Sequence, residues 1–201
     1  MKKFLLIFVS ILLIGTATCA FGETDYDYGR QAYLSQQYSK ALTYYENAIK
    51  ANPNYFDAWY GKGEVYLVGN QNEDALKAFQ KAASIKPDSA KAYAGQATAY
   101  IGMKKFPEAL ASINKSIEID NTTHEAYEIR AMIYHEQKNN GDALADLEKA
   151  IELAPKDPAP YGVRSLIKMD MGDSKGAYAD YKKFQKYTKQ AEKEAKKNVM
   201  I

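Results

Sequence analysis

The sequence predicts an all-α fold built from tandem helical hairpins, and three observations support this prediction. An alanine recurs at a fixed 34-residue step, at Ala41, Ala75, Ala109, Ala143 and Ala177. Within each step, small and bulky residues follow the i, i+4, i+7 spacing of one helix face. No stretch of the chain has a pattern typical of a β-strand.

Residues 56–89 show the predicted hairpin most clearly. Trp59, Gly63 and Tyr66 share one stripe of a first helix. The spacing recurs in a second helix at Ala75, Phe79 and Ala82. The turn-forming residues 69–72 separate the two helices. Small residues let the two helices approach closely while aromatic residues fill the remaining space, so neither helix could bury its stripe alone.

Other positions keep the same step. The small residue of the first helix recurs as Gly29, Gly63, Ala97, Ala131 and Ser165. The bulky residue of the second helix recurs as Tyr45, Phe79, Ile113, Leu147 and Tyr181. A proline, which a helix cannot continue through, closes three of the units at Pro53, Pro87 and Pro155.

This spacing resembles the tetratricopeptide repeat, a pattern of aromatic, small, aromatic, alanine, bulky, alanine and proline positions. The resemblance covers residues 22–191 and implies a right-handed α-solenoid of five repeats with a C-terminal capping helix. The repeats would be residues 22–55, 56–89, 90–123, 124–157 and 158–191, followed by a basic helical tail over residues 192–201.

The chain departs from the family pattern just before the small residue of the first helix. The family usually has leucine there, whereas this chain has Tyr28, Lys62, Gln96, Arg130 and Arg164. We expect the polar replacements to loosen the packing without changing the period.

Residues 1–22 have the three-part pattern of a bacterial-type secretory signal peptide. Two lysines precede an apolar run over residues 4–14, which is too short to span a bilayer, and small residues follow it. Two cleavage frames fit, Thr18–Ala20 and Ala20–Gly22, and the second leaves Glu23 as the first residue. We therefore expect an exported protein, periplasmic or extracellular.

Cys19 is the only cysteine in the chain and opens an alternative, a lipoprotein signal in which this residue is acylated. The residues before it resemble the lipoprotein motif poorly, so we favour an unlipidated protein. Cleavage after residue 22 would leave a chain without cysteine, which could form no disulfide and no cysteine metal site.

The sequence offers little that could support catalysis. His124 and His135 are the only histidines, and neither has a ligand partner at the spacing typical of metal sites. We find no glycine-rich phosphate loop and no set of serine or carboxylate residues with catalytic spacing. We predict that the protein is not an enzyme and needs no cofactor or metal.

Surface recognition remains as the expected function. In the tetratricopeptide family, the first helix of each hairpin lines the concave side of the solenoid, where peptide segments bind. By position, the resemblance implies a peptide-binding face at Tyr26, Arg30, Tyr33, Asp57, Tyr60, Glu64, Leu67, Lys91, Thr98, Glu125, Glu128, Met132 and His135. The chain would then be a scaffold that binds a protein or peptide.

Acidic residues dominate the inner positions of all five repeats. The acidic residues at these positions are Glu23, Asp57, Glu64, Glu125, Glu128, Glu136 and Asp170, against Arg30 and Lys91. A groove of one sign favours a ligand of the opposite sign, so we predict a basic partner. The alternative is that these acids only keep an exposed helix face soluble.

The C-terminal segment, residues 182–201, is basic, with seven lysines against two glutamates. We interpret it as a solvated helix face and expect no nucleic acid partner. The alternative function is an envelope-associated spacer that docks on anionic lipid or glycan through this helix.

Overall fold

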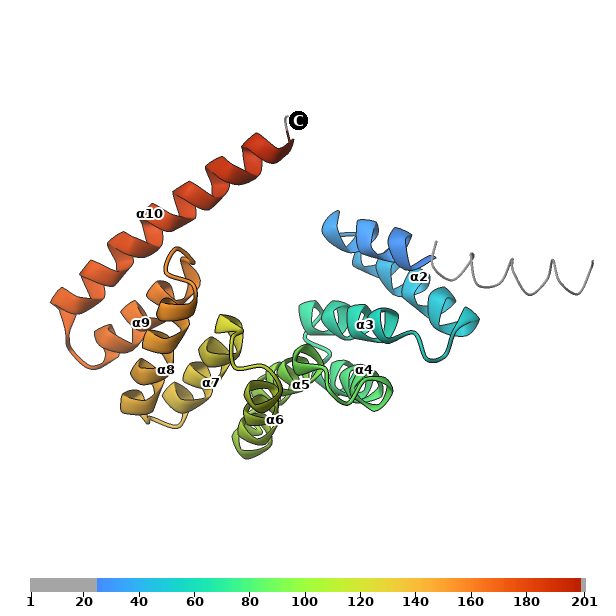
Figure 1. Cartoon of the computed structure of the whole chain (residues 1–201), viewed down its shortest axis with the longest axis horizontal. Coiled ribbons are helices and arrows are strands. Elements are labelled where there is room, and N and C mark those ends of the chain that lie inside the picture. Colours follow the sequence, from blue (N-terminus) through green and yellow to red (C-terminus); the bar gives the residue numbers. More distant parts are fainter. Residues whose placement is uncertain (1–24, 200–201) are drawn as a thin grey trace, which may run out of the picture. The chain divides into compact units, whose positions relative to one another are not determined.

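The computed structural model describes the backbone of residues 25–199 and the side chains of residues 25–195. The proposed signal peptide (1–22), with Cys19, and the proposed first mature residue Glu23 lie outside the described residues. All regular structure in the described part is α-helical, which confirms the predicted fold class. Helical residues 25–34 come first, followed by α2 (Tyr38–Ala51), α3 (Phe56–Val68), α4 (Asn72–Ile85), α5 (Ala90–Gly102), α6 (Phe106–Ile119), α7 (His124–Glu136), α8 (Asn140–Leu153), α9 (Ala159–Asp170) and α10 (Ser174–Val199) (Figure 1).

The described residues form two compact units that divide between Lys104 and Lys105, called unit 1 and unit 2, and each is described by itself. Unit 1 ends in the turn after α5, and unit 2 begins just before α6. Within each unit, every helix from α2 onward packs against the next one along the chain. The helices therefore form a series of antiparallel hairpins, as the repeated alanine step predicts.

Contacts between non-consecutive helices show which side of each unit is the inner one. In unit 1, α3 contacts α5, and in unit 2, α7 contacts α9. Among the described residues, no comparable contact joins α2 with α4 or α8 with α10. The first helices of successive repeats thus lie closer together than the second helices do, which places the first helices on the inner side of the curvature of each unit.

The core confirms the repeat register. The five alanines at the repeat step have no exposed surface: Ala41, Ala75, Ala109, Ala143 and Ala177. The bulky residue of the second helix is also buried in the first four repeats, at Tyr45, Phe79, Ile113 and Leu147. The fifth, Tyr181, is 46% exposed. In repeat one, the Tyr45 ring is covered by Gly61 of repeat two, so closely that a Cβ added to Gly61 would meet the ring. Within the described residues, no further repeat packs over Tyr181.

At two of the positions where this chain lacks the leucine usual in the family, and where we expected looser packing, the structure has ion pairs. Arg130 donates to both carboxylate oxygens of Asp146 at 2.8 Å. Arg164 does the same with Asp180, at 2.8 and 2.7 Å, and Lys168 adds a third bond at 2.7 Å. A bidentate arginine pair is rigid and specific, so these two repeats replace an apolar contact with a polar one.

The turns between paired helices share one backbone conformation. A residue with positive φ occurs at the same step as the alanines, at Gln36, Asn70, Lys104, Lys138 and Gly172. A left-handed residue commonly ends an α-helix because it lets the next amide groups bond back to the last turn. Only the last of these positions is a glycine, so residue type alone did not reveal the motif.

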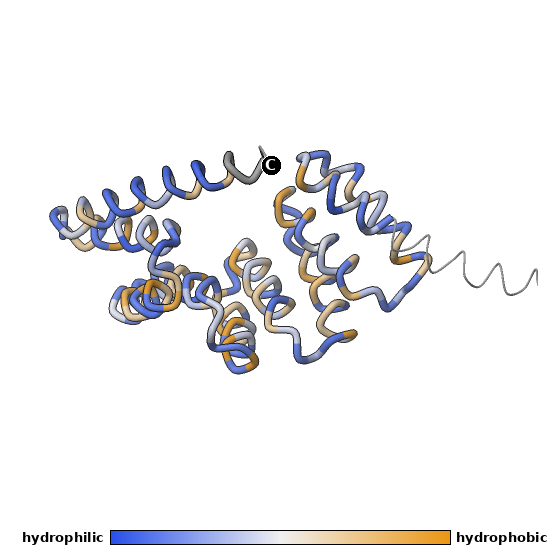
Figure 2. Tube along the Cα trace, turned by 45° about the horizontal axis from the view of Figure 1, so that its top comes forward, coloured by the Kyte–Doolittle hydropathy of each residue, from blue (hydrophilic) through white to orange (hydrophobic). Residues whose placement is uncertain are grey.

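Helix α10 caps unit 2, as predicted. Tyr187 lies 5.4 Å from Tyr161 between ring centroids, and the Phe184 ring would be 3.1 Å from a Cβ added to Gly162. Residues 182–191 therefore include part of the cap. Figure 2 shows that α10 is largely hydrophilic along its length. Within the described residues, no helix is long and apolar enough to cross a membrane.

Candidate functional site

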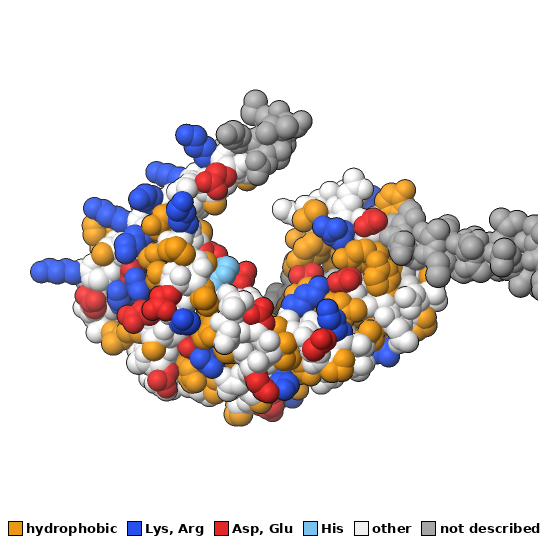
Figure 3. Space-filling model, in the orientation of Figure 1, with side chains coloured by type: hydrophobic (Ala, Val, Ile, Leu, Met, Phe, Trp, Pro, Cys, Tyr) orange, Lys and Arg blue, Asp and Glu red, His pale blue; other side chains and the backbone are white. Residues whose placement is uncertain are grey.

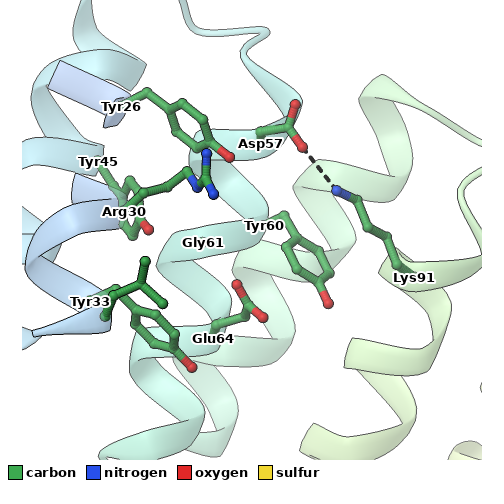
Figure 4. Close-up of a pocket in the computed structure, with 10 residues that line it drawn as sticks. Tyr26, Arg30, Tyr33, Tyr45, Asp57, Tyr60, Gly61, Glu64 and Lys91 are labelled. Carbon is green, nitrogen blue, oxygen red and sulfur yellow. Dashed lines mark hydrogen bonds and ion pairs between the residues drawn. The ribbon is translucent and has the colours of Figure 1, made fainter. Parts of the chain in front are cut away.

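A pocket of about 260 Å³ lies on the inner side of unit 1. Helical residues 25–34, α2, α3 and the start of α5 form its walls (Figure 4). The lining residues are Tyr26, Arg30, Tyr33, Leu34, Tyr45, Asp57, Tyr60, Gly61, Glu64 and Lys91. Seven residues of the predicted peptide-binding face come together here: Tyr26, Arg30, Tyr33, Asp57, Tyr60, Glu64 and Lys91. Tyr45 and Gly61 also line the pocket but were not predicted as residues of the inner face.

Tyrosine rings give the pocket rigid walls. Tyr26 packs 5.1 Å from Tyr55 and 6.0 Å from Tyr45 between ring centroids, and Tyr60 packs 5.4 Å from Phe79. Burial raises the pKa of the Tyr60 phenol, and the nearby charge of Glu64 raises it further. The phenol therefore stays protonated at neutral pH and can donate a hydrogen bond to a ligand.

One ion pair spans the pocket between two first helices. Lys91 Nζ lies 2.9 Å from Asp57 Oδ1, and the two residues are 34 positions apart in the sequence. The same ammonium group lies 4.7 Å from the centre of the Tyr60 ring and 4.8 Å from that of Phe56. These aromatic faces therefore already bind a cation in the free protein.

Two further charges in the pocket have no such partner. Within the described part of the chain, neither the Arg30 side chain nor the Glu64 side chain makes a hydrogen bond or an ion pair. Burial raises the pKa of the Glu64 carboxyl, and the charge of Lys91 offsets only part of that effect. With two basic and two acidic side chains, the pocket is formally neutral, so the acidic excess predicted for the whole inner face is not found in this part of it.

The other predicted residues lie outside this pocket. Leu67 packs on the core around Phe79, and the Thr98 hydroxyl donates to the Ala94 carbonyl of its own helix at 3.1 Å. The remaining members, Glu125, Glu128, Met132 and His135, are on α7 in unit 2.

In unit 2, acidic side chains surround His124. Its Nε2 lies 2.7 Å from Asp157 Oδ2 and 3.9 Å from Glu128 Oε1, and its Nδ1 lies 3.2 Å from Glu125 Oε2. Burial, followed by the charge of Asp157, raises the pKa of Glu128 to about 7, against the opposing effect of His124. The expectation that neither histidine has a potential ligand partner is therefore wrong for His124. Neither His124 nor Asp157 was among the predicted site residues.

The second histidine also bridges two first helices. His135 Nδ1 lies 3.0 Å from Asn140 Oδ1, and its Nε2 lies 3.3 Å from Asp170 Oδ2. These contacts involve α7, α8 and α9. His135 therefore lies at the junction of repeats four and five, and its partner Asp170 is exposed.

The paired helices, the fixed step and the inner pocket define a helical-repeat scaffold for protein interaction. Sequence models of the family described as tetratricopeptide repeat match residues 26–90, 69–133 and 124–157. The chain belongs to the tetratricopeptide repeat family. This family is generally non-enzymatic.

Solved structures of the same fold support this assignment. TTC0263, a thermophilic tetratricopeptide repeat protein of Thermus thermophilus, matches with a TM-score of 0.77 and 22% identity, over 89% of this chain and 96% of that one. PilW, a type IV pilus biogenesis factor, matches with a TM-score of 0.76 and 25% identity, over 84% and 78% of the two chains. YrrB matches with a TM-score of 0.58 and 17% identity, over 81% and 84%. No protein of curated function matches the chain in sequence.

Proposed function

We propose that the chain is an exported scaffold that binds a partner protein by accepting one of the partner's lysine or arginine side chains in the pocket of unit 1. The observation that carries this proposal is the placement of Glu64. Figure 4 shows its carboxylate between Tyr33 and Tyr60. It has no bonded cation within the described residues, although it is half-buried.

A cation from a partner would satisfy the chemistry of this pocket. A carboxylate that has lost part of its hydration is stabilised by a bound ammonium or guanidinium group. The aromatic walls favour the same groups, because Lys91 already stacks on Tyr60 and Phe56. Arg30, exposed at the opposite wall, could pair with an acidic side chain next to the inserted residue.

One of the structural relatives, YrrB, gives a precedent for peptide binding. YrrB is described as having an unusual peptide-binding site, and PilW is described as a pilus biogenesis factor. Peptide recognition is therefore a reasonable expectation for this fold. The proposed export rests on the signal-like pattern of residues 1–22.

Site-specific photo-crosslinking tests the binding proposal in cells that export the protein. Leu34 lines the pocket and is 74% exposed, so a photo-reactive phenylalanine there should reach a bound segment without disturbing the core. Lys81 on α4 is the matched exposed control. We expect an adduct from position 34 whose cross-linked segment contains lysine or arginine. Equal adducts from positions 34 and 81 would argue against the pocket as the binding site.

Intact mass spectrometry of the exported protein tests the processing. We expect a chain that begins at Glu23 and carries no lipid. A mass that fits an acylated Cys19 would replace this expectation with a lipid-anchored protein.

A second candidate function rests on the lysine side chains of α10. Toward its C-terminal end, the described lysines are exposed at Lys182, Lys183, Lys186, Lys189 and Lys193 (Figure 3). Such a surface could dock on anionic lipid. Because Phe184 and Tyr187 belong to the cap, a truncation that tests this function should remove only residues 192–201. Loss of binding to phosphatidylglycerol vesicles, with the fold intact, would support this candidate.

A further inference from the structure

We propose that His124, Glu128 and Asp157 form a binding site for a divalent transition-metal ion, with Zn²⁺ as the reference ion. His124 is the first residue of α7, and Glu128 lies one turn later on the same helix face. Asp157 comes from the loop between α8 and α9. One potential ligand atom from each side chain lies within 4.8 Å of the other two. Around a single zinc ion, with bonds of about 2.0–2.2 Å, neighbouring ligand atoms are roughly 3–4 Å apart. Small side-chain rotations would bring the three atoms to that spacing.

The orientation of the imidazole supports metal binding. Nε2 faces Asp157 and Glu128, while Nδ1 lies 3.2 Å from Glu125 Oε2. A histidine that binds a metal through one ring nitrogen usually donates from the other nitrogen to a carboxylate, which fixes the ring and its tautomer. Glu125 is placed to take that positioning role.

An independent observation comes from Glu128. Its side chain is 12% exposed, and its Oε1 atom is buried with no hydrogen-bond partner among the described residues. Buried carboxylate oxygens without a partner are rare, because the lost hydration is costly. The contact between His124 and Asp157 leaves this oxygen unsatisfied. A cation shared by all three groups would satisfy it.

The ligand types restrict the choice of ion. One imidazole nitrogen and two carboxylate oxygens, with no thiolate, suit Zn²⁺, Co²⁺ or Mn²⁺ better than a soft ion such as Cu⁺. Ca²⁺ prefers a shell made only of oxygen atoms. Three protein ligands would leave at least one position of the ion open to water.

A metal at this place would link the first helix of repeat four to the loop that leads into α9. Glu128 and His124 belong to the first helix of repeat four, and Asp157 accepts a hydrogen bond from the Ala159 amide at the start of α9, at 2.8 Å. The ion would therefore tie α9 to α7 and stabilise unit 2. Ligands that bind only the folded state raise its melting temperature by mass action.

Isothermal titration calorimetry on the chelator-treated full chain, with ZnCl₂ as the probe, tests the proposal. We expect one saturable site and a rise in melting temperature of about 4 °C or more once Zn²⁺ exceeds the dissociation constant about 100-fold. Glu128→Gln, which keeps the side-chain shape, and Asp157→Asn should each weaken binding at least 10-fold. His135→Gln, at the other repeat junction, is the matched control and should bind as the wild type does.

A second measurement does not depend on any variant. In the wild-type protein, Zn²⁺ should shift the imidazole nitrogen resonances of His124 and leave those of His135 unchanged. The proposal is overturned if no saturable binding of Zn²⁺, Co²⁺ or Mn²⁺ is found, if Glu128→Gln binds Zn²⁺ as tightly as the wild type, or if the His124 resonances do not respond.

Discussion

The ring of Phe79 occupies the space that a side chain on Gly63 would need. A Cβ built on Gly63 would lie 2.7 Å from Phe79 Cε1, and a Cβ on Gly95 would lie 2.7 Å from the same ring. The ring is thus held between glycines of two successive repeats. Tyr45 has the same relationship to Gly29 and Gly61, at 2.6 Å in each case. In repeats one and two, the aromatic residue in the bulky position is therefore held between two glycines.

Replacing Gly63 by alanine should destabilise unit 1 by about 1–3 kcal/mol, because the added methyl group overpacks the Phe79 ring. This is opposite to the usual effect of the change inside a helix, which stabilises by roughly 0.5–1 kcal/mol. Gly141→Ala is the matched control, since the nearest atom to its Cβ would be 4.0 Å away. Urea denaturation measures both variants.

A compensating change should restore part of the loss. Repeat four combines Ala131 with Leu147, both fully buried. The double variant Gly63→Ala with Phe79→Leu copies that combination and should be more stable than Gly63→Ala alone. A lower stability of the double variant would contradict this explanation of the packing.

Lys138→Gly should stabilise unit 2 by about 0.5–1 kcal/mol. The backbone of Lys138 has φ of 62°, a conformation that costs an L-residue energy and glycine almost none. The same replacement at Lys149, inside α8, should instead destabilise by about 1 kcal/mol. Thermal melts of the two variants that shift in the same direction would show that the turn conformation is not under strain.

Asp180→Ala should destabilise unit 2 by roughly 3 kcal/mol at pH 7, since it leaves Arg164 and Lys168 without their buried partner. Burial alone would raise the pKa of Asp180, but its bonds to Arg164 and Lys168 outweigh burial and lower it. A lowered carboxyl pKa stabilises the folded state above the ordinary carboxyl pKa of about 4, and this contribution is lost as the pH falls further.

The difference in the free energy of unfolding between the wild type and Asp180→Ala should therefore become smaller as the pH falls from 5 toward 2. Urea midpoints at several pH values measure it. Asp74→Ala, which breaks an exposed pair with Lys77, should change stability by less than about 0.5 kcal/mol. A pH-independent difference for Asp180→Ala would contradict the assigned role of its charge.

Glu64→Gln should stabilise unit 1 at neutral pH. Burial raises the pKa of the Glu64 carboxyl in the folded state. Ionisation of this carboxyl therefore destabilises the folded state once the pH exceeds the ordinary carboxyl pKa. The stabilisation should thus be present at pH 7.5 and absent near pH 3.5. Melting temperatures at the two pH values test this, with the exposed loop variant Asp88→Asn as the control.

The repeat period predicted most of the core correctly. Ala75 and its equivalents are fully buried between closely packed helices. Only a small side chain fits there, so alanine recurs at this position in every repeat. The role of Gly63 was only partly predicted. The sequence suggested a close approach of helices, whereas the structure shows that the aromatic ring of Phe79 takes the space.

The period also contained signals that were missed. Packing of successive repeats brings residues about one repeat apart in the sequence into contact, as in Lys91 with Asp57 and His124 with Asp157. Spacing within one helix cannot reveal such pairs, so the surroundings of His124 were not predicted. The left-handed turn residues were missed because Lys104 and Lys138 are not typical of that conformation.

Glu64 is central to the proposed function, because its carboxylate would receive the cationic side chain of a partner. A random peptide library selected on the immobilised mature protein supplies the ligands. Calorimetry then compares each selected peptide on wild type, Glu64→Gln and the exposed α4 variant Glu73→Gln.

We predict that the selected peptides are rich in lysine or arginine and that binding weakens as salt rises. Loss of the charge at Glu64 should weaken binding at least 10-fold, about 1.4 kcal/mol, while Glu73→Gln has no effect. Selected peptides that lack basic residues, or that bind Glu64→Gln as tightly as the wild type, would contradict the claim.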